Sequence, residues 1–357
     1  MRIQSCAILG LLLFTAPAHA GLFKITNRNY GSATGNALAQ ASVDSVFNTL
    51  ETQINSKLPN ADQSTYLKGI ANSAVISGAG VGVDYATKYS LFDVGIAVGV
   101  GADLGGASLT DVANGNVKAN QIAGFAGQYS LMIGVPAHLS KGKISFLDLN
   151  RLKIYVNYLS SSFNKSGLQS HFSSWGTDFQ YKIVPERSAG LGVARWNGVD
   201  LTSGVRYSSM DLLIAQAINQ SATGTAGGGS VTAAFNGIAN VGANVHTFTV
   251  PVEVSTSARV AYFLTPYVGL GVDLSFGSAT SVANVNGPIS VTSNSGPTGV
   301  TGVGSLDLGE NQGPQFLNLR YFVGAQIEAG VVAIFVQLNQ AVTNDTTGVA
   351  AGLRAYW

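Results

Sequence analysis

Few residues of this chain are of the types that carry out catalysis. Cys6 is its only cysteine, and its four histidines are His19, His138, His171 and His246. No two of these histidines lie at the short spacing at which neighbouring residues bind one metal ion. The sequence therefore predicts no metal site and no cofactor.

One histidine has serines near it in the sequence, which raises the question of a hydrolytic site. His171 lies close to Ser170, Ser173 and Ser174. A Ser–His–Asp triad is recognised by its geometry, and closeness in sequence is poor evidence for one. We therefore expect no catalytic residue and keep a hydrolase as a minor alternative.

The stronger candidates are charged residues that alternate with apolar ones. Because successive side chains of a strand point to opposite faces, these charges fall on one face and their apolar neighbours on the other. The candidates are Asp84, Asp93, Asp103, Lys153, Asp178, Lys182, Asp200, Arg206, Glu253, Asp273, Arg320, Glu328 and Arg354. A strongly selective pore uses charges of one sign, so these mixed signs predict either a salt-bridged, closed interior or a weakly selective channel.

The composition of the chain is poor in charged residues and rich in apolar ones. Charged residues make up 10% of the 357 residues, against roughly 25% in soluble domains. Hydrophobic residues make up 46%, there are 44 glycines, and the formal net charge is +1. These values exclude a disordered chain and argue against nucleic acid as a partner. Beyond the first twenty residues there is no apolar run long enough for a membrane helix.

A period of two residues dominates the chain. In 92–104, for example, Phe92, Val94, Ile96 and Val98 alternate with small or charged residues. The same pattern occurs in 77–85, 92–104, 125–135, 152–158, 175–183, 199–207, 246–254, 268–276, 317–328, 332–339 and 348–357. Strands that cross a bilayer at a tilt need about 9–11 residues, and several of these segments are that long.

These segments predict an all-β fold, a closed antiparallel transmembrane β-barrel of about twelve strands, with ten to fourteen allowed. In hydrocarbon every backbone polar group must be satisfied within the protein, so the sheet must close on itself. Its apolar face then meets lipid and its polar face lines the interior, where the charged candidates would lie. A soluble sandwich or lipocalin-like barrel is the alternative, but this chain has few charges to cover its outside.

The last residues sharpen this interpretation. Val349, Leu353 and Trp357 fall on one face of the final strand, which ends in an aromatic residue. This strand resembles the terminal strand of bacterial outer-membrane β-barrel proteins. The resemblance implies that outer-membrane lipid and the barrel-assembly machinery are partners, the latter reading these three residues.

The first twenty residues have the pattern of a secretory signal peptide. Arg2 precedes an apolar stretch, and Ala18, His19 and Ala20 form a small–x–small cleavage site. We expect cleavage after Ala20, which would leave a mature chain without cysteine, exported to the cell outer membrane.

The connections indicate an orientation. If Trp357 ends in the periplasm, then Thr87–Leu91, Tyr262–Pro266 and Glu328–Gly330 are short inner turns, as expected for this class. The outer connections would be long loops, at Gly105–Asn120, Met210–Asn244 and Gly277–Pro314. Two inner connections, Pro136–Arg151 and Pro185–Asn197, are longer than this rule favours.

When the alternating strand directions are followed back to the start of the chain, one crossing of the membrane is missing. Residues 21–74 must supply it. Apolar residues from Ala37 to Leu58 recur at helical spacing, Pro59 ends the pattern, and a second helix is expected at Ala61–Asn72. The segment could plug the lumen, cap the periplasmic side beside a strand within 21–31 or 65–76, or lie on the surface. We predict a signal peptide (1–20), a helical plug or cap (21–74) and a barrel (75–357).

Two functions compete. The first is passive transport of small or apolar solutes through a partly plugged lumen, and a segment before the barrel is similar to fatty-acid-type outer-membrane transporters. The second is a structural or adhesin-like surface barrel that acts through its long outer loops. A barrel-form hydrolase is the minor alternative, and the sequence alone favours transport.

Overall fold

The computed structural model describes residues 24–31, 37–55, 63–86, 92–105, 124–137, 143–144, 147–165, 168–189, 194–226, 229–293, 296–308 and 311–357. The expected signal peptide and its cleavage site lie outside these residues. So do His138 and most of the expected outer connection Gly105–Asn120.

Within the described residues the chain is mainly β-structure with two α-helices, α2 (Ala37–Asn55) and α3 (Gln63–Ser77), and a 3-10 helix at Leu149–Arg151. Neither α-helix combines the length and the apolarity that a membrane-crossing helix needs. The main strands are β2 (Asp93–Asp103), β3 (Gly124–Pro136), β6 (Leu152–Lys165), β7 (Leu168–Val184), β9 (Ala194–Ala226), β10 (Gly229–Val260), β11 (Leu264–Ser293), β14 (Leu317–Ala329), β15 (Val332–Ala341) and β16 (Thr346–Tyr356). The others are β1 (Lys24–Asn29), β4 (Lys143–Ile144), β5 (Leu147–Asp148), β8 (Arg187–Ala189), β12 (Gly296–Leu308) and β13 (Asn311–Gln312).

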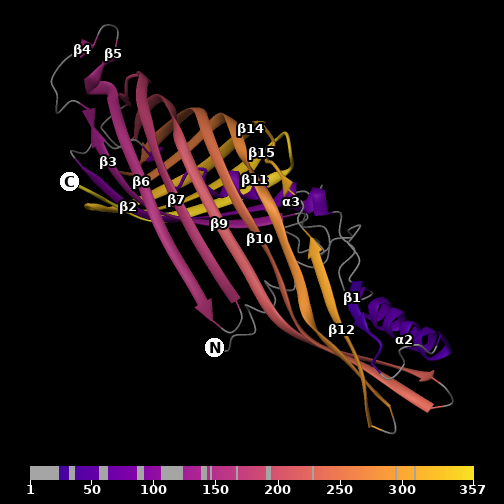
Figure 1. Ribbon diagram of the computed structural model, residues 1–357. Helices are drawn as coiled ribbons and strands as arrows, with labels where there is room; N and C mark the ends of the chain where they lie inside the picture. The colour runs from indigo at the N-terminus through magenta and orange to yellow at the C-terminus, as the bar shows by residue number, and fades with distance from the viewer. Residues whose placement is uncertain are drawn as a thin grey trace.

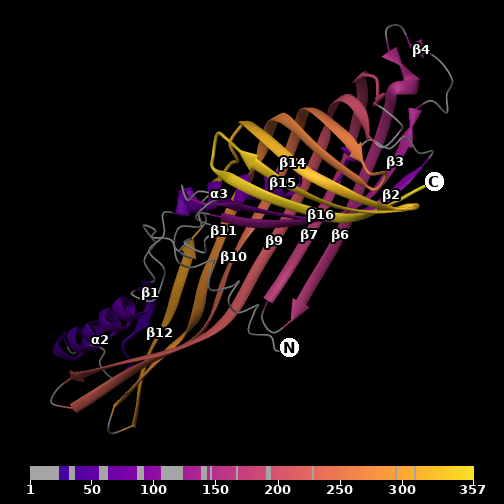
Figure 2. The same ribbon diagram turned by 180° about the vertical axis from the view of Figure 1, so that it is seen from behind.

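The ten main strands form a ring of hydrogen-bonded neighbours (Figures 1 and 2). The order runs β11-β10-β9-β7-β6-β3-β2-β16-β15-β14, and β14 pairs again with β11. Every neighbouring pair is antiparallel, including the pair of the first and last ring strands, β2 and β16. The all-β fold expected from the sequence is confirmed, and the ring of ten described strands lies at the lower limit of the expected range.

One of the eleven expected strands, 77–85, is wrong. Ser77 ends α3, and Gly78 and Ala79 donate backbone hydrogen bonds to Val75 and Ile76 in a closing turn. Gly80 then has φ 86°, a left-handed conformation that interrupts an extended strand. Removing this strand also removes the missing crossing, because the first ring strand is β2.

Two expected outer loops are also wrong. Met210–Asn244 and most of Gly277–Pro314 are continuous parts of β9, β10, β11 and β12. These strands run beyond the rest of the ring as one sheet, which carries β1 on β12 at one edge and α2 on its face (Figure 1). We call this extension the arm: β1, α2, β12 and the parts 209–226 of β9, 229–246 of β10 and 278–293 of β11.

The two faces of β10 exchange their polarity where the ring passes into the arm. On the face that points away from the ring interior, the residues from Val260 back to Phe248 are largely apolar, and those of the arm are largely polar. The polar outward residues of the arm are Thr232, Asn236, Asn240, Asn244 and His246. On the inward face the order is reversed: Ser257, Ser255, Glu253, Thr249 and Thr247 in the ring give way to Val245, Ala243, Ala239, Phe235, Ala233 and Val231 in the arm.

A row of aromatic side chains marks the exchange. Tyr158, Trp175, Tyr207, Phe248 and Phe276 are register partners across β6, β7, β9, β10 and β11. The rings of Trp175 and Tyr207 stack with centroids 5.8 Å apart. Aromatic residues gather at the edges of the apolar belt in membrane barrels, so this row fits one edge of a lipid-facing belt.

The height of the apolar belt agrees with a bilayer. From Phe248 to Val260 the strand advances by 260 − 248 = 12 residues, or about 40 Å at about 3.3 Å per residue. At the tilt of about 35–45° that is usual for such strands, this is about 28–32 Å across, close to the hydrocarbon thickness of about 30 Å.

The opposite end of the ring carries the short connections. Residues 261–263 join β10 to β11, and Gly330 and Val331 join β14 to β15. The end of β16 lies at the same edge, because Tyr356 pairs with Asp93 at the start of β2. We call this edge the inner end, and the arm extends from the other edge.

Candidate functional site

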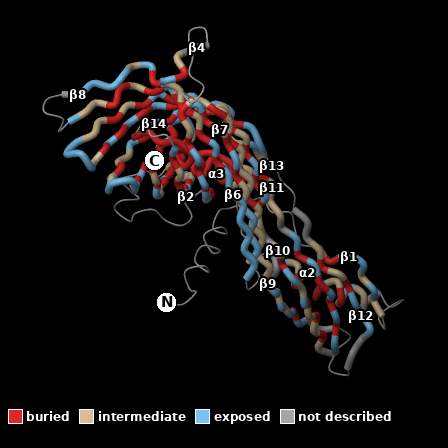
Figure 3. The backbone as a smooth tube through the Cα atoms, turned by 90° about the vertical axis from the view of Figure 1, so that its left-hand side faces the viewer, coloured by how far each residue is buried: buried red, intermediate tan, exposed pale blue. Residues whose placement is uncertain are grey.

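The interior of the ring, its lumen, is filled by the chain's own N-terminal part. Helix α3 contacts β2, β3, β10, β11 and β16 from inside the ring, and residues 71–86 are all buried (Figure 3). A cavity beside α3, lined by Ala74, Gln128 and Arg206 among others, measures about 10 Å³, which is about the space of one water molecule.

Glycines on the wall make room for α3. A Cβ atom at Gly99 would lie 1.9 Å from the backbone oxygen of Ser77, and one at Gly101 would lie 2.2 Å from that of Ser73. These distances are below any real contact, so a larger residue at either position would displace the helix. These inward glycines therefore make room for the N-terminal segment inside the ring.

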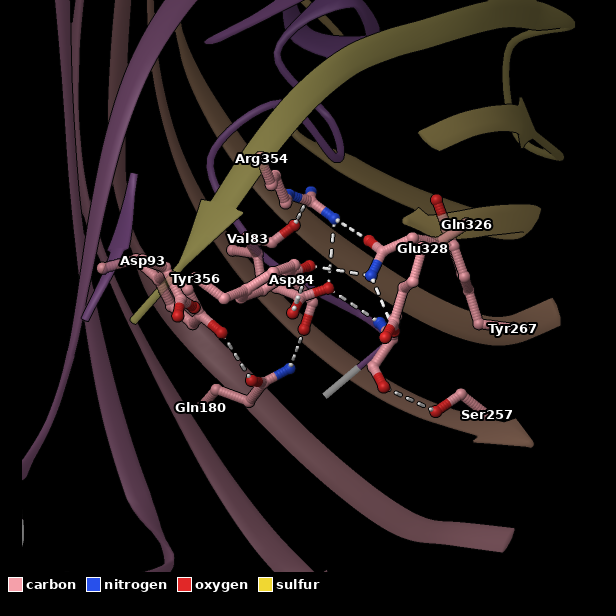
Figure 4. Close-up of polar contacts among 12 residues, drawn as sticks. Val83, Asp84, Asp93, Gln180, Ser257, Tyr267, Gln326, Glu328, Arg354 and Tyr356 are labelled. Carbon is pink, nitrogen blue, oxygen red and sulfur yellow. Dashed lines mark hydrogen bonds and ion pairs between the residues drawn. The ribbon is translucent and has the colours of Figure 1, made fainter. Parts of the chain in front are cut away.

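After α3 in the chain comes Asp84, which is held by side chains of β16, the last ring strand (Figure 4). Arg354 Nη1 lies 3.1 Å from Asp84 Oδ1, and Arg354 Nη2 donates to the carbonyl of Val83 at 2.5 Å. Tyr356 donates its hydroxyl hydrogen to Asp84 Oδ2 at 3.3 Å, and Gln326 Oε1 accepts from Arg354 at 3.0 Å. A buried carboxylate with these donors can stay ionised without contact to water.

Wall side chains also recognise the backbone of this segment. Gln180 donates to the carbonyl of Asp84 at 3.1 Å, Asn197 to that of Ala86 at 3.0 Å, and Asn339 to that of Ala79 at 3.2 Å. Carbonyls outside regular secondary structure must find donors when buried. We call residues 78–86 the inner plug, and its backbone carbonyls obtain those donors from several different strands.

A second charged cluster surrounds Glu253 on β10. Its carboxylate accepts hydrogen bonds from the Tyr85 hydroxyl of the inner plug and from Arg320, and lies 3.2 Å from Arg206 Nη2. The plug therefore contributes a donor as well as an acceptor to the wall.

The other charges of the wall are also paired. The pairs are Arg206 with Asp178 at 2.9 Å, Arg320 with Asp273 at 2.8 Å, Lys182 with Asp200 at 3.4 Å, and Lys153 with Asp93. Of the two arrangements that the mixed signs left open, the geometry corresponds to the salt-bridged, closed interior.

The structure places the charged candidates as follows. Ten of them are buried on the inward face of ring strands: Asp93, Lys153, Asp178, Lys182, Asp200, Arg206, Glu253, Asp273, Arg320 and Arg354. Asp84 is buried on the inner plug, not on a strand. Asp103 and Glu328 are half-buried at opposite ends of the ring, and Glu328 lies 3.5 Å from Arg259.

Several neutral polar partners were missed by a search for charges. Gln180 and Tyr356 occupy the same alternate positions as the charged candidates, so the period itself could have found them. Tyr85 falls on the apolar face of the expected strand 77–85, which would meet lipid. It is instead fully buried against Tyr267 and Phe322, because that segment is not a strand.

The residues of the expected assembly signal face outward. Val349, Leu353 and Trp357 are 49%, 45% and 64% exposed. Their exposure places them on the apolar outer surface of the last strand, while Arg354 and Tyr356 between them point into the lumen.

The expected serine–histidine neighbours do not meet. Ser174 donates its hydroxyl hydrogen to the carbonyl of Tyr129 at 2.9 Å, and His171 lies opposite Asp211 across β7 and β9. The Ser–His contact in the described part of the chain is between His246 and Ser278, 2.7 Å apart, on the outward face. No carboxylate forms an ion pair with either histidine among the described residues, so no triad is assembled there.

The arm has its own hydrophobic core beneath α2. Val43, Val46, Phe47 and Leu50 recur at helical spacing and are nearly inaccessible to solvent. They pack with the inward face of the arm sheet: Ala222, Val231, Ala233, Phe235, Ala239, Val285, Ile289 and Val291. Helix α2 therefore covers the apolar face that the exchange of polarity creates.

Arg28 joins β1 to α2. Its guanidinium lies 2.6 Å from Asp44 Oδ1 and 3.0 Å from Glu51 Oε1, and the backbone N–H of Ile25 donates to the same Glu51 oxygen at 2.7 Å. Partial burial lowers the pKa of Arg28, but the two carboxylates outweigh it, so this pKa lies above its ordinary value.

Comparison with known proteins assigns the family. The Lsa36-like family model matches residues 19–357. The chain belongs to the Lsa36-like family. A comparison with curated proteins finds no match.

Solved structures align with this Lsa36-like chain at low identity. The transport unit of the autotransporter AIDA-I from Escherichia coli is 10% identical, with 80% of this chain and 97% of that chain covered and a TM-score of 0.30. The Acinetobacter baumannii outer membrane protein Omp33 is 10% identical, with 75% and 98% covered and a TM-score of 0.25. The Ralstonia pickettii toluene transporter TbuX is 7% identical, with 82% and 99% covered and a TM-score of 0.24.

The pair of Asp84 and Arg354 supports a first prediction. Arg354→Met leaves the buried Asp84 carboxylate without its cation, which costs about 3–5 kcal/mol of unfolding free energy. Denaturant unfolding in detergent micelles measures this cost as a shift of the midpoint.

The matched control is Arg195→Met, which breaks the exposed ion pair of Arg195 with Glu186 and costs about 0–1 kcal/mol. Equal midpoints for the two variants would show that the inner plug is not anchored through Arg354.

Proposed function

We propose that the ring spans the bacterial outer membrane and presents the arm outside the cell as a binding surface. The observation that carries this proposal is the exchange of polarity along β10. In the ring the strand has apolar side chains outside and polar ones inside, and in the arm it has polar side chains outside and apolar ones inside. That order suits a strand that leaves a bilayer and enters a water-exposed sheet.

The orientation follows from the connections. In outer-membrane barrels the short turns lie in the periplasm and the longer segments lie outside. The short turns at 261–263 and 330–331 are at the inner end, so the arm is the outer part. Along β10 the arm continues for 246 − 229 = 17 residue steps, about 55 Å of strand at about 3.3 Å per residue.

The arm's outward side chains indicate how it would bind. They are mostly uncharged hydroxyl and amide groups: Asn219, Ser221, Thr223, Asn236, Asn284, Asn286, Ser290 and Thr292 are exposed. Such groups bind a partner by hydrogen bonds, as a glycan or a polar protein surface would require. Because few charges are involved, added salt would screen little of the interaction.

Transport was the function that the sequence favoured, and the filled lumen now ranks it second. Solute passage requires α3 and the inner plug to leave their places, and the plug is held by Arg354, Asn197, Gln180 and Asn339. With α3 and the inner plug displaced, the wall would carry charges of both signs and glycines. That lining is the feature that favours a channel in the unplugged ring.

Conductance separates the two functions. In planar bilayers the full mature chain is expected to show no channel steps, because α3 and the inner plug occupy the lumen. A variant that lacks residues 24–86 is expected to show them. Channel steps in the full chain at the frequency of the shortened variant would contradict the proposal and favour transport.

The arm can be tested by a substitution in its core. Phe235→Asp places an unpaired charge where the side chain is fully buried, which is strongly destabilising, so the arm should lose its structure while the ring remains. Retention of cells displaying this variant on arrays of immobilised glycans and proteins is expected to fall at least about tenfold. A tenfold loss of affinity corresponds to about 1.4 kcal/mol of binding free energy.

The matched control is the next residue, whose side chain lies on the opposite, exposed face. Asn236→Asp adds the same charge to the arm without entering its core and should retain the arm structure. If Phe235→Asp cells are retained as well as wild-type cells, the arm is not the binding surface.

A further inference from the structure

Strand β1 and the start of the first ring strand, β2, lie toward opposite ends of the ring. β1 pairs with β12 within the arm, with Lys24 opposite Ser305 and Ile25 opposite Gly304. The first ring strand, β2, begins at Asp93, which is paired with Tyr356 at the inner end. Residues between these points must therefore pass from the arm to the inner end.

The path between them runs through the lumen. After α2 on the arm, α3 lies within the ring against β2, β3 and β16. The inner plug then continues toward the inner end, where Ala86 accepts from Asn197 and Ser257, close to the start of β9 and the end of β10. Because each ring strand is hydrogen-bonded to two neighbours, the chain has crossed inside the ring and not between strands.

We infer that the N-terminal segment crosses the outer membrane inside the chain's own ring, so that Lys24 and the residues after it lie on the cell surface. This inference rests on the proposed function, because it takes the arm to be outside. The first ring strand then begins in the periplasm and the last ring strand ends there, as usual for an even number of strands, yet the segment that starts at Lys24 lies outside.

The arm offers this segment a surface to pack on. The inward face of the arm sheet is apolar, and α2 is the element that covers it and shields it from water. An α-helix with its side chains is about 10–12 Å wide, and α3 already fills the lumen. In the folded chain the arm core is therefore completed by a helix that is connected to the inner end through the ring.

The contacts of β1 and α2 fix them on the outside once they arrive. Arg28 bridges to Asp44 and Glu51 of α2, and its guanidinium lies 5.4 Å from the ring centre of Phe47. Since β1 also extends the arm sheet at β12, helix and strand are held as one unit.

Single cysteines can test this topology, because Cys6 is the chain's only cysteine. In a Cys6→Ser background we would place one cysteine at an exposed position of the full chain: Thr26→Cys in β1, Ser221→Cys in the arm part of β9, or Arg187→Cys in β8 at the inner end. Each is reacted with a membrane-impermeant maleimide on intact cells and again after the outer membrane is permeabilised. Resistance of the folded chain to unfolding in cold detergent confirms that each variant has folded.

Thr26→Cys and Ser221→Cys are expected to react on intact cells to at least about 80% of their permeabilised level, and Arg187→Cys to react only after permeabilisation. Reaction of Ser221→Cys but not Thr26→Cys on intact cells would overturn the inference and leave the proposed function standing. Failure of Ser221→Cys to react on intact cells would contradict the proposed function itself. An epitope tag placed before Lys24 repeats the test should Thr26→Cys fail to fold.

Discussion

The constraint on which the proposed arrangement depends is that the same strands must satisfy two solvents. In hydrocarbon a strand needs both edges hydrogen-bonded and an apolar outward face; in water it needs a polar outward face and a covered apolar one. β9, β10 and β11 would meet both demands in turn, and their pairing and alternation continue unbroken through the point of exchange, from Asn244 to Thr249 of β10. The aromatic row through Trp175, Tyr207 and Phe248 is where one set of demands replaces the other.

The two helices follow from this exchange. In the ring the inward face is polar and lined with charges, so whatever fills it must offer donors and acceptors, as Asp84 and Tyr85 do. In the arm the inward face is apolar, so it takes the amphipathic α2. The lumen pairs themselves add little net stability, because desolvation offsets most of their attraction, but each leaves a costly unpaired charge if its partner is lost. They therefore specify one position for the inner plug.

Much of the ring could be predicted from the sequence, because alternation over ten segments has a direct physical cause. The segment 77–85 misled because Gly78, Gly80 and Gly82 alternate with larger residues, which imitates a strand. In the lumen both of its faces are buried, and glycine serves there for close packing. The arm was missed because its apolar residues move to the opposite face. A search for one constant lipid-facing side therefore ends at His246 and interprets the rest as loop. Which charge would pair with which could not be predicted, since it depends on register across the sheet.

The most direct test of the central claim is the solvent that surrounds the outward side chains of β10. Spin labels at Val254, Val252, His246 and Asn236, one at a time in lipid vesicles, report collisions with oxygen, which concentrates in lipid, and with a water-soluble nickel complex. The account predicts that oxygen dominates at Val254 and Val252 and nickel at His246 and Asn236, with the change next to Phe248. Nickel access at Val252 equal to that at Asn236 would contradict it.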